Sequence, residues 1–86
     1  MERRDIEHGV TEIVRKLLAI REGHALSPEA DFKIDLGTDS LFDAEFGMEV
    51  EDRFEIEVPD GVHPRNIREA TDLILTTLSK DTAPAS

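Results

Sequence analysis

The chain has 86 residues, which is room for one small domain with a thin hydrophobic core. It carries 20 acidic and 10 basic side chains, and the formal net charge of −10 disfavours nucleic acid and anionic membrane surfaces as partners. The absence of cysteine excludes disulfides, cysteine-ligated metal centres and a cysteine nucleophile.

The sequence shows no targeting or membrane segment. No apolar run approaches the roughly 20 residues that a membrane span needs. The first residues lead into an amphipathic stretch instead of the apolar core of a signal peptide. We therefore expect a cytoplasmic protein without a membrane span.

The negative charge is concentrated in one third of the chain. Residues 29–60 hold twelve acidic side chains and two basic ones, Lys33 and Arg53, so this segment alone carries −10. The remaining residues hold eight side chains of each sign. Two interpretations stay open, a solvated helix face or a docking surface for basic partners.

The first predicted helix covers Asp5 to Arg21, because apolar residues recur there at three- and four-residue intervals. The buried stripe consists of Ile6, Val10, Ile13, Val14, Leu17 and Leu18. Gly23 stands where helices commonly end, and Ser27-Pro28-Glu29 is typical of a turn.

A long loop is predicted before the second helix. Phe32, Ile34 and Leu36 alternate with polar residues, a spacing that is compatible with a strand. Because no neighbouring segment offers a pairing partner, we interpret the segment as an extended loop that is pinned by these apolar anchors.

The second helix is predicted to begin at Asp39-Ser40 and to run to about Phe54. Either polar side chain at its start can accept a hydrogen bond from an unpaired amide of the first turn. The turn sequence Val58-Pro59-Asp60-Gly61 follows, and Pro64 leaves room for only a short third helix around Pro64 to Ile67.

A last amphipathic helix is marked by Ala70, Leu73, Ile74 and Leu78. The predicted fold is all-α, a small antiparallel four-helix bundle with three longer helices, a short third helix and a long loop between helices one and two. We expect the domain to cover residues 1–80 and the polar tail 81–86 to be disordered.

The second helix carries two apolar stripes. Phe42, Phe46, Val50 and Phe54 share one face, which must be core. A second stripe on the opposite side, where a bundle helix should meet water, consists of Leu41, Ala44 and Met48. It is flanked by acidic residues, so it is either scattered exposed apolar surface or, as we favour, a transient interface for basic partners.

The segment Leu36-Gly37-Thr38-Asp39-Ser40-Leu41 resembles the loop-and-serine signature of acyl carrier proteins, in which an Asp-Ser-Leu triplet opens the second helix. The resemblance continues through Met48, Val50 and Phe54 to Val58-Pro59-Asp60 and extends more weakly into both terminal helices, so it covers about residues 5–80. The triplet alone is a weak motif, but its combination with the acidic helix and the chain length is specific.

The resemblance implies that Ser40 accepts 4′-phosphopantetheine from coenzyme A through a Mg²⁺-dependent phosphopantetheinyl transferase. The distal thiol of this arm would carry acyl groups as thioesters. Asp39 would help to present the serine, while Phe32, Leu36 and Gly37 would shape the approach loop. A phosphate on the first residue of a helix meets unpaired amides and the positive end of the helix dipole. On spacing alone, Ser40 could instead be an ordinary helix cap.

The resemblance also assigns partner recognition to the second apolar stripe and its acidic flank. The carried-over positions are Leu41, Ala44, Glu45, Met48, Glu49 and Asp52. The implied partners are the transferase, an acyl-loading ligase or acyltransferase, and ketosynthase or condensation-type enzymes. A monomeric carrier is expected to visit them in turn.

Three departures from the family pattern point to a specialised carrier. Phe42 stands where many fatty-acid carriers have an acidic residue, which makes the entrance more apolar. Gly47 lies in mid-helix, with either a roomier acyl cavity or only a looser helix as its consequence. The segment His63–Arg68 is basic where the family is often acidic, which suggests different partners there.

The sequence contains no visible catalytic apparatus, since His8, His24 and His63 are dispersed and no calcium-loop or phosphate-cradling motif matches. We therefore expect a carrier and not an enzyme. The leading function is an acyl carrier of fatty-acid, polyketide or lipopeptide biosynthesis. The alternatives are an aminoacyl or peptidyl carrier of nonribosomal peptide synthesis, and an acidic helical interaction module without an arm. Leu36-Gly37-Thr38-Asp39 and the net charge favour acyl cargo.

Overall fold

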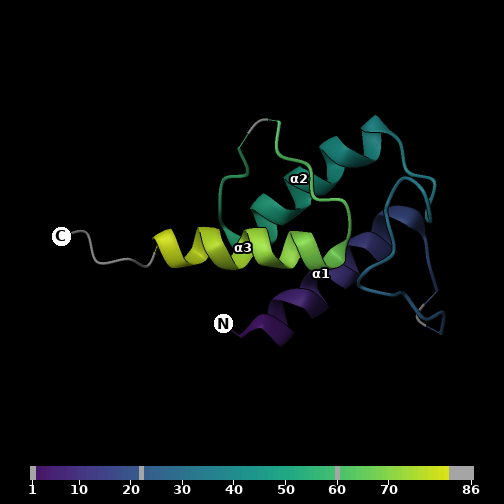
Figure 1. Cartoon of the computed structure of the whole chain (residues 1–86), viewed down its shortest axis with the longest axis horizontal. Helices are drawn as coiled ribbons and strands as arrows, with labels where there is room; N and C mark the ends of the chain where they lie inside the picture. Colours follow the sequence, from purple (N-terminus) through teal and green to yellow (C-terminus); the bar gives the residue numbers. More distant parts are fainter. Residues whose placement is uncertain (1, 22, 60, 82–86) are drawn as a thin grey trace.

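The computed structural model describes residues 2–21, 23–59 and 61–81, and these residues form three helices and no strand. They are α1 (Arg3–Leu18), α2 (Ser40–Phe54) and α3 (Ile67–Asp81). In Figure 1, α2 and α3 both run opposite to α1, with the long loop joining α1 to α2. The all-α prediction is therefore confirmed. None of these helices is long and apolar enough to cross a membrane.

The three helices enclose one core along the stripes that the sequence predicts. From α1 the buried residues are Ile6, Val10, Ile13 and Val14. The other elements contribute Phe32, Phe42, Phe46, Val50, Phe54, Ile56, Ile67, Ala70 and Ile74. The apolar faces of α2 and α3 both pack against that of α1, so the core seats these two helices on the first one.

The first helix ends at Leu18, three residues before the predicted end. Ala19 takes a left-handed backbone conformation with φ 54°, and the N–H of Ile20 donates to the carbonyl of Arg15 at 2.9 Å. This arrangement closes the last turn of the helix without a glycine. Gly23 therefore lies beyond the helix end, inside the following loop.

The short third helix around Pro64 to Ile67 is not formed, so the expectation of a four-helix bundle is wrong on this point. The carbonyl of Arg65 accepts the N–H of Phe32 at 2.8 Å and is not used in a local helical turn. The side chain of Asn66 accepts the N–H of Glu69 at 2.8 Å. Asn66 thus caps α3, which begins at the next residue.

The last helix is confirmed, and it extends one residue into the predicted tail. Its backbone remains helical through Asp81, whereas the tail was expected to begin there. Residues 82–86, the rest of that tail, lie outside the described residues.

The loop before α2 contains a capped turn instead of an extended segment. The carboxylate of Asp31 accepts the N–H groups of Lys33 and Ile34, each at 2.9 Å. The N–H of Asp35 donates to the carbonyl of Asp31, also at 2.9 Å. A short polar side chain that binds nearby backbone amides in this way favours a tight turn over an extended strand.

This turn changes which apolar residues of the loop face the core. Phe32 is buried and Leu36 packs against the core, because residues four apart lie on the same side of a helical turn. Ile34 points the other way and is 77% exposed. The prediction of three apolar anchors was therefore wrong for Ile34, since it assumed a period of two.

Two backbone hydrogen bonds join the loop before α2 to the loop before α3. The N–H of Phe32 donates to the carbonyl of Arg65 at 2.8 Å, and the N–H of Arg68 donates to the carbonyl of Pro28 at 3.0 Å. We call this contact between residues 28–32 and 65–68 the loop clamp. It fixes the approach to α2 from a segment that is far away in the sequence.

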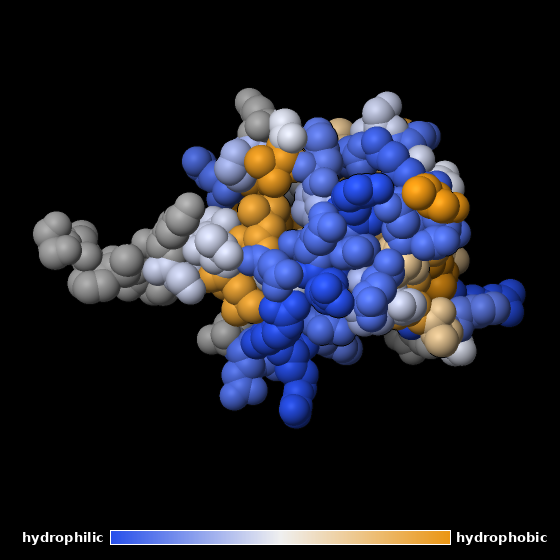
Figure 2. All heavy atoms as spheres, viewed as in Figure 1, coloured by the Kyte–Doolittle hydropathy of each residue, from blue (hydrophilic) through white to orange (hydrophobic). Residues whose placement is uncertain are grey.

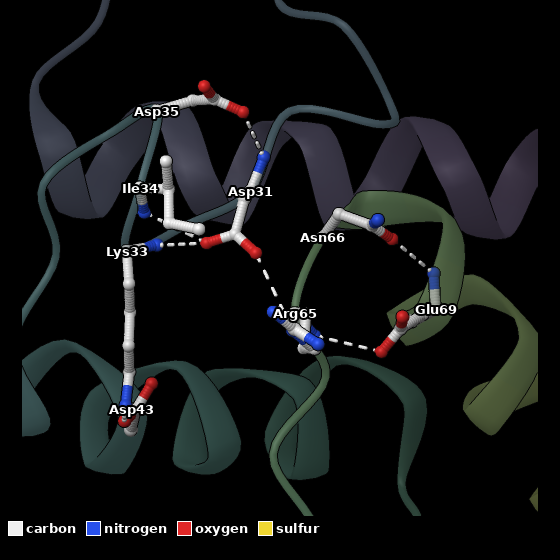
Figure 3. Close-up of polar contacts among 8 residues, drawn as sticks. All are labelled: Asp31, Lys33, Ile34, Asp35, Asp43, Arg65, Asn66 and Glu69. Carbon is white, nitrogen blue, oxygen red and sulfur yellow. Dashed lines mark hydrogen bonds and ion pairs between the residues drawn. The ribbon is translucent and has the colours of Figure 1, made fainter.

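Ion pairs accompany the loop clamp, and they use the basic segment that stands out in the sequence. Arg65 lies 3.5 Å from Asp31, and Arg68 lies 3.6 Å from Glu29. Figure 3 shows Arg65 between the loop of Asp31 and the start of α3. Both arginines of the basic segment 63–68 therefore have acidic partners within the chain. From the sequence, this segment was expected to bind different partner enzymes.

The environment of Asp31 lowers the pKa of its carboxyl below the usual 3.8. The hydrogen bond from the N–H of Ile34 is the main cause, the N–H of Lys33 and the charge of Arg65 act in the same direction, and desolvation opposes them. Because the pKa is lower in the folded chain, the ionised carboxylate stabilises the fold above the unfolded-state value.

Asp31→Asn should lower the free energy of unfolding at neutral pH, because the amide accepts these hydrogen bonds without a negative charge. The difference from the wild type should shrink as the pH falls through 3.8 toward the folded-state pKa. Urea unfolding at a series of pH values measures this difference. Asp52→Asn on the exposed side of α2 is the control, and an equal, pH-independent effect of both variants would contradict the assignment.

The two glycines inside helices differ in what surrounds them. A Cβ on Gly9 would meet Cζ of Phe54 at 2.9 Å and Nε of Arg53 at 3.1 Å, whereas a Cβ on Gly47 would meet nothing within 4 Å. Gly9 therefore permits the close approach of α1 and α2. Packing does not require Gly47. It destabilises the helix, because a glycine loses more backbone conformational entropy on folding than other residues do.

Gly9→Ala and Gly47→Ala should change stability in opposite directions. Gly47→Ala should raise the free energy of unfolding by about 0.5–1 kcal/mol through helix propensity. Gly9→Ala should lower it by about 1 kcal/mol or more, because overpacking of the core outweighs the same gain. Chemical unfolding of both variants measures the two changes, and a stabilising Gly9→Ala would show that the helix contact yields easily.

Candidate functional site

Ser40 is the first residue of α2 and is exposed. The residue before it, Asp39, caps the helix: its backbone is extended, and its carboxylate accepts the N–H of Phe42 at 3.0 Å. Among the contacts of the described residues, none involves the hydroxyl of Ser40. Asp39 thus performs the capping role that the sequence left open between the two residues, and the serine hydroxyl is not needed for it.

Three aromatic rings hold the loop against α2 beside this serine. Phe32 contacts Phe42 and Phe46 edge to face, with ring centroids 5.2 and 5.4 Å apart. Phe42 and Phe46 stack on each other at 5.5 Å. Phe42 thus belongs to the core, as its helix face predicts, and it does not line an apolar entrance. These contacts fix where Ser40 stands relative to the core.

The backbone between Phe32 and Ser40 turns sharply. The N–H of Thr38 donates to the carbonyl of Phe32 at 3.0 Å, and Gly37 has φ 67°, a conformation that favours glycine. Together with the half-buried Leu36, this turn directs the chain out of the core and into the first turn of α2. The predicted role of these loop residues in shaping the approach to Ser40 agrees with this geometry.

The start of α2 fits an attached phosphate group. Asp39 binds the amide of Phe42 through its side chain and that of Asp43 through its carbonyl, at 3.0 and 3.3 Å. In the described structure, the amides of Ser40 and Leu41 have no such acceptor, as expected for a first helical turn. Free amides and the positive end of the helix dipole favour the negative charge of a phosphate group attached to the Ser40 oxygen.

The second apolar stripe of α2 is exposed, as the helix geometry predicts. Leu41 is 63% exposed and Met48 is 66% exposed, and Ala44 lies on the surface between them. In the view of Figure 2, hydrophilic residues cover most of the surface and hydrophobic ones form smaller patches. We call the residues carried over by the resemblance the α2 face, which consists of Leu41, Ala44, Glu45, Met48, Glu49 and Asp52.

The acidic members of the α2 face differ in how free they are. Glu45 and Asp52 are exposed. Glu49 is only partly exposed, and its two carboxylate oxygens lie 2.9 and 3.0 Å from the ammonium group of Lys16 on α1. Among the acidic residues of the α2 face, Glu45 and Asp52 are therefore the carboxylates most available to a partner.

A small pocket lies between α2, the loop before α3 and α3. Its volume is about 20 Å³, which is room for roughly one water-sized group. Its walls are largely apolar, and Gly47 and Val62 belong to them, with Asp43 and His63 as polar members. Open space lies where a side chain on Gly47 would begin. Gly47 therefore leaves one wall of this pocket uncovered.

Sequence reasoning missed one ion pair near the site. Lys33 of the loop lies 3.6 Å from Asp43 on the first turns of α2. Lys33 and Asp43 are ten positions apart, and only the capped turn at Asp31 brings the lysine back toward the helix. In the sequence, the only hint of this ion pair is that Lys33 is a basic residue within a strongly acidic segment.

Comparison with protein families matches residues 8–62 to the family described as phosphopantetheine attachment site. A relative named acyl carrier protein, from Cyanidioschyzon merolae (strain NIES-3377 / 10D), is 40% identical over 68 residues, which cover 77% of this chain and 74% of the relative. The match includes the loop, the capped serine and all of α2.

The chain therefore belongs to the acyl carrier protein family, and the group that this domain carries is covalent 4′-phosphopantetheine. The exposed Ser40 at the head of α2 and the free amides beside it fit such a group, as derived above.

Proposed function

We propose that the chain carries acyl groups as thioesters on a 4′-phosphopantetheine arm attached to Ser40, and that it delivers them to enzymes of fatty-acid, polyketide or lipopeptide biosynthesis. The observation that carries this proposal is that Asp39, and not Ser40, provides the side-chain cap of α2. Asp39 caps α2, so the hydroxyl of Ser40 is exposed and available for modification. The chain would act as a substrate and shuttle, without catalysis of its own.

The chemistry of attachment would be supplied by a Mg²⁺-dependent phosphopantetheinyl transferase. The oxygen of Ser40 bonds to the phosphorus next to the pantetheine of coenzyme A, the pyrophosphate bond breaks, the adenosine bisphosphate leaves and the hydroxyl proton is released. Asp39 keeps the serine at the first helical position, where the amides of Ser40 and Leu41 favour the added charge. When bound, the arm supplies the thiol that a chain without cysteine lacks.

Ser40→Ala should abolish loading. Wild-type protein incubated with coenzyme A, Mg²⁺ and a promiscuous phosphopantetheinyl transferase should gain the mass of one arm, and the variant should gain none. Intact mass spectrometry measures the shift. Ser27→Ala, at the serine that accepts the N–H of Glu29, is the matched control and should load fully.

Loading of the Ser40→Ala variant would overturn the assignment of the attachment residue. Failure of the wild-type chain to load would favour the alternative from another class, an acidic helical interaction module without an arm.

The α2 face is proposed as the surface that partner enzymes recognise. Its exposed apolar centre, Leu41, Ala44 and Met48, would supply contact area. The carboxylates of Glu45 and Asp52 would steer basic partners toward it. Glu49 would contribute less, because Lys16 already neutralises part of its charge.

Glu45→Lys should slow transfer between the loaded carrier and a ligase, acyltransferase or ketosynthase, by about tenfold at low salt, because electrostatic steering acts on association. It should also reduce the dependence of the transfer rate on salt. Glu57→Lys makes the same charge change beyond α2, at an exposed site, and should alter the rate much less. Equal rates and salt slopes for Glu45→Lys and the wild type would refute recognition through Glu45.

The cargo is the second part of the proposal. The high negative charge and Leu36-Gly37-Thr38-Asp39 favour acyl cargo over the aminoacyl or peptidyl groups of nonribosomal peptide synthesis. Gly47 lines the small apolar pocket, and an acyl chain would enter there only if the pocket widened, because its volume of about 20 Å³ holds roughly one water-sized group. We further propose a monomeric carrier in the cytoplasm. Supplying fatty acids or amino acids with candidate ligases separates the two kinds of cargo.

A further inference from the structure

The capped turn of the loop places one cation against the first turns of α2. The ammonium group of Lys33 lies 3.6 Å from a carboxylate oxygen of Asp43. The lysine side chain is 65% exposed, whereas that of Asp43 is only 14% exposed. Figure 3 shows Lys33 extending from the turn of Asp31 to Asp43 on α2. The lysine can therefore move, while the carboxylate is held by its surroundings.

Asp43 stands three positions after Ser40 on the same helix, so the two side chains are neighbours on its surface. Residues with this spacing have Cβ atoms about 5–6 Å apart. The ammonium group of Lys33, which contacts Asp43, therefore lies on the same part of the helix surface as the side chain of Ser40. A lysine has a flexible four-carbon stem and three rotatable donors, which suits it to follow such a group.

The other paired cations of the described chain are engaged elsewhere. The arginines Arg65 and Arg68 pair in the loop clamp, while the remaining pairs are Arg3 with Asp72, Lys16 with Glu49, and Arg53 with Glu12. By contrast, the start of α2 itself carries Asp39 and Asp43. A phosphodiester there would add a negative charge to an acidic neighbourhood, and Lys33 is the base whose observed contact borders it.

We propose that Lys33 is a positioning residue for the arm: after Ser40 is modified, its ammonium group pairs with the phosphodiester and holds the capped turn against the start of α2. This inference rests on the proposed attachment at Ser40. Before modification, Asp43 keeps Lys33 in place. Afterwards, Asp43 and the phosphodiester share it, so the arm leaves the helix along the side where the loop lies.

The test compares proteins with and without the arm, for the wild type and for Lys33→Gln and Lys33→Arg. Hydrogen exchange of the amides in residues 32–40 measures how firmly the loop is held, and phosphorus NMR reports the surroundings of the phosphodiester. Attachment should slow exchange in the wild type by about two- to fivefold, the effect of one exposed ion pair. The arginine variant should retain this slowing, and the glutamine variant should lose it.

Lys16→Gln is the matched control, because it removes the other lysine that pairs with α2, nine positions beyond Ser40 at Glu49. It should leave both the arm-dependent slowing and the phosphorus signal unchanged. Lys33→Gln should shift the phosphorus signal. Since each variant is compared with its own unmodified form, a merely structural effect of the substitution on the loop cancels.

Either of two results would overturn the inference: an arm-dependent slowing of equal size in Lys33→Gln and the wild type, or no slowing in the wild type. An equal loss in Lys16→Gln would also overturn it, because general charge would then explain the effect. Intact mass spectrometry of each sample keeps the two proposals apart. Absence of the arm from wild-type protein would refute the proposed function itself, whereas a loaded protein without the Lys33 effect would refute only this inference.

Discussion

The ring of Phe32 lies between the loop and α2, edge to face with Phe42 and Phe46, and the position of the serine depends on this contact. Phe32 also donates its N–H to the carbonyl of Arg65, so one residue ties the loop both to α2 and to the loop before α3. One buried aromatic residue and a few hydrogen bonds fix the part of the loop at Phe32, while the nearby residue Ile34 stays exposed. The fold thereby presents Ser40 at a defined place on the surface, although its core is small.

Most basic side chains of the described residues form ion pairs within the molecule, and α2 keeps exposed carboxylates that are not paired. The bases of α1 and of the loop before α3 pair with acids across element boundaries, as Lys16 does with Glu49 and Arg65 with Asp31. Exposed ion pairs of this kind contribute little to stability, but they decide which carboxylates stay free. Those left free on α2, Glu45 and Asp52, lie along one flank of its exposed apolar stripe, an arrangement that suits brief contacts with basic enzymes.

Sequence reasoning succeeded where a repeating pattern meets one buried face, and it failed where the backbone depends on partners distant in sequence. The stripes of α1, α2 and α3 follow from their three- and four-residue spacing. Ile34 was placed wrongly because the alternation around it suggests a strand, whereas the carboxylate of Asp31 winds the same residues into a turn. The short third helix was wrong because the carbonyl of Arg65 serves Phe32 instead of a local turn.

The sequence by itself determined the helical class, the core stripes, the acidic helix and the serine at its head, because each depends on residues close together along the chain. Tertiary structure decided that Glu49 is paired with Lys16 and that Lys33 reaches Asp43. These outcomes depend on how a loop without a repeating pattern packs against helices that are distant in sequence. Local residue preferences do not encode such contacts, since they form only when the core brings the elements together.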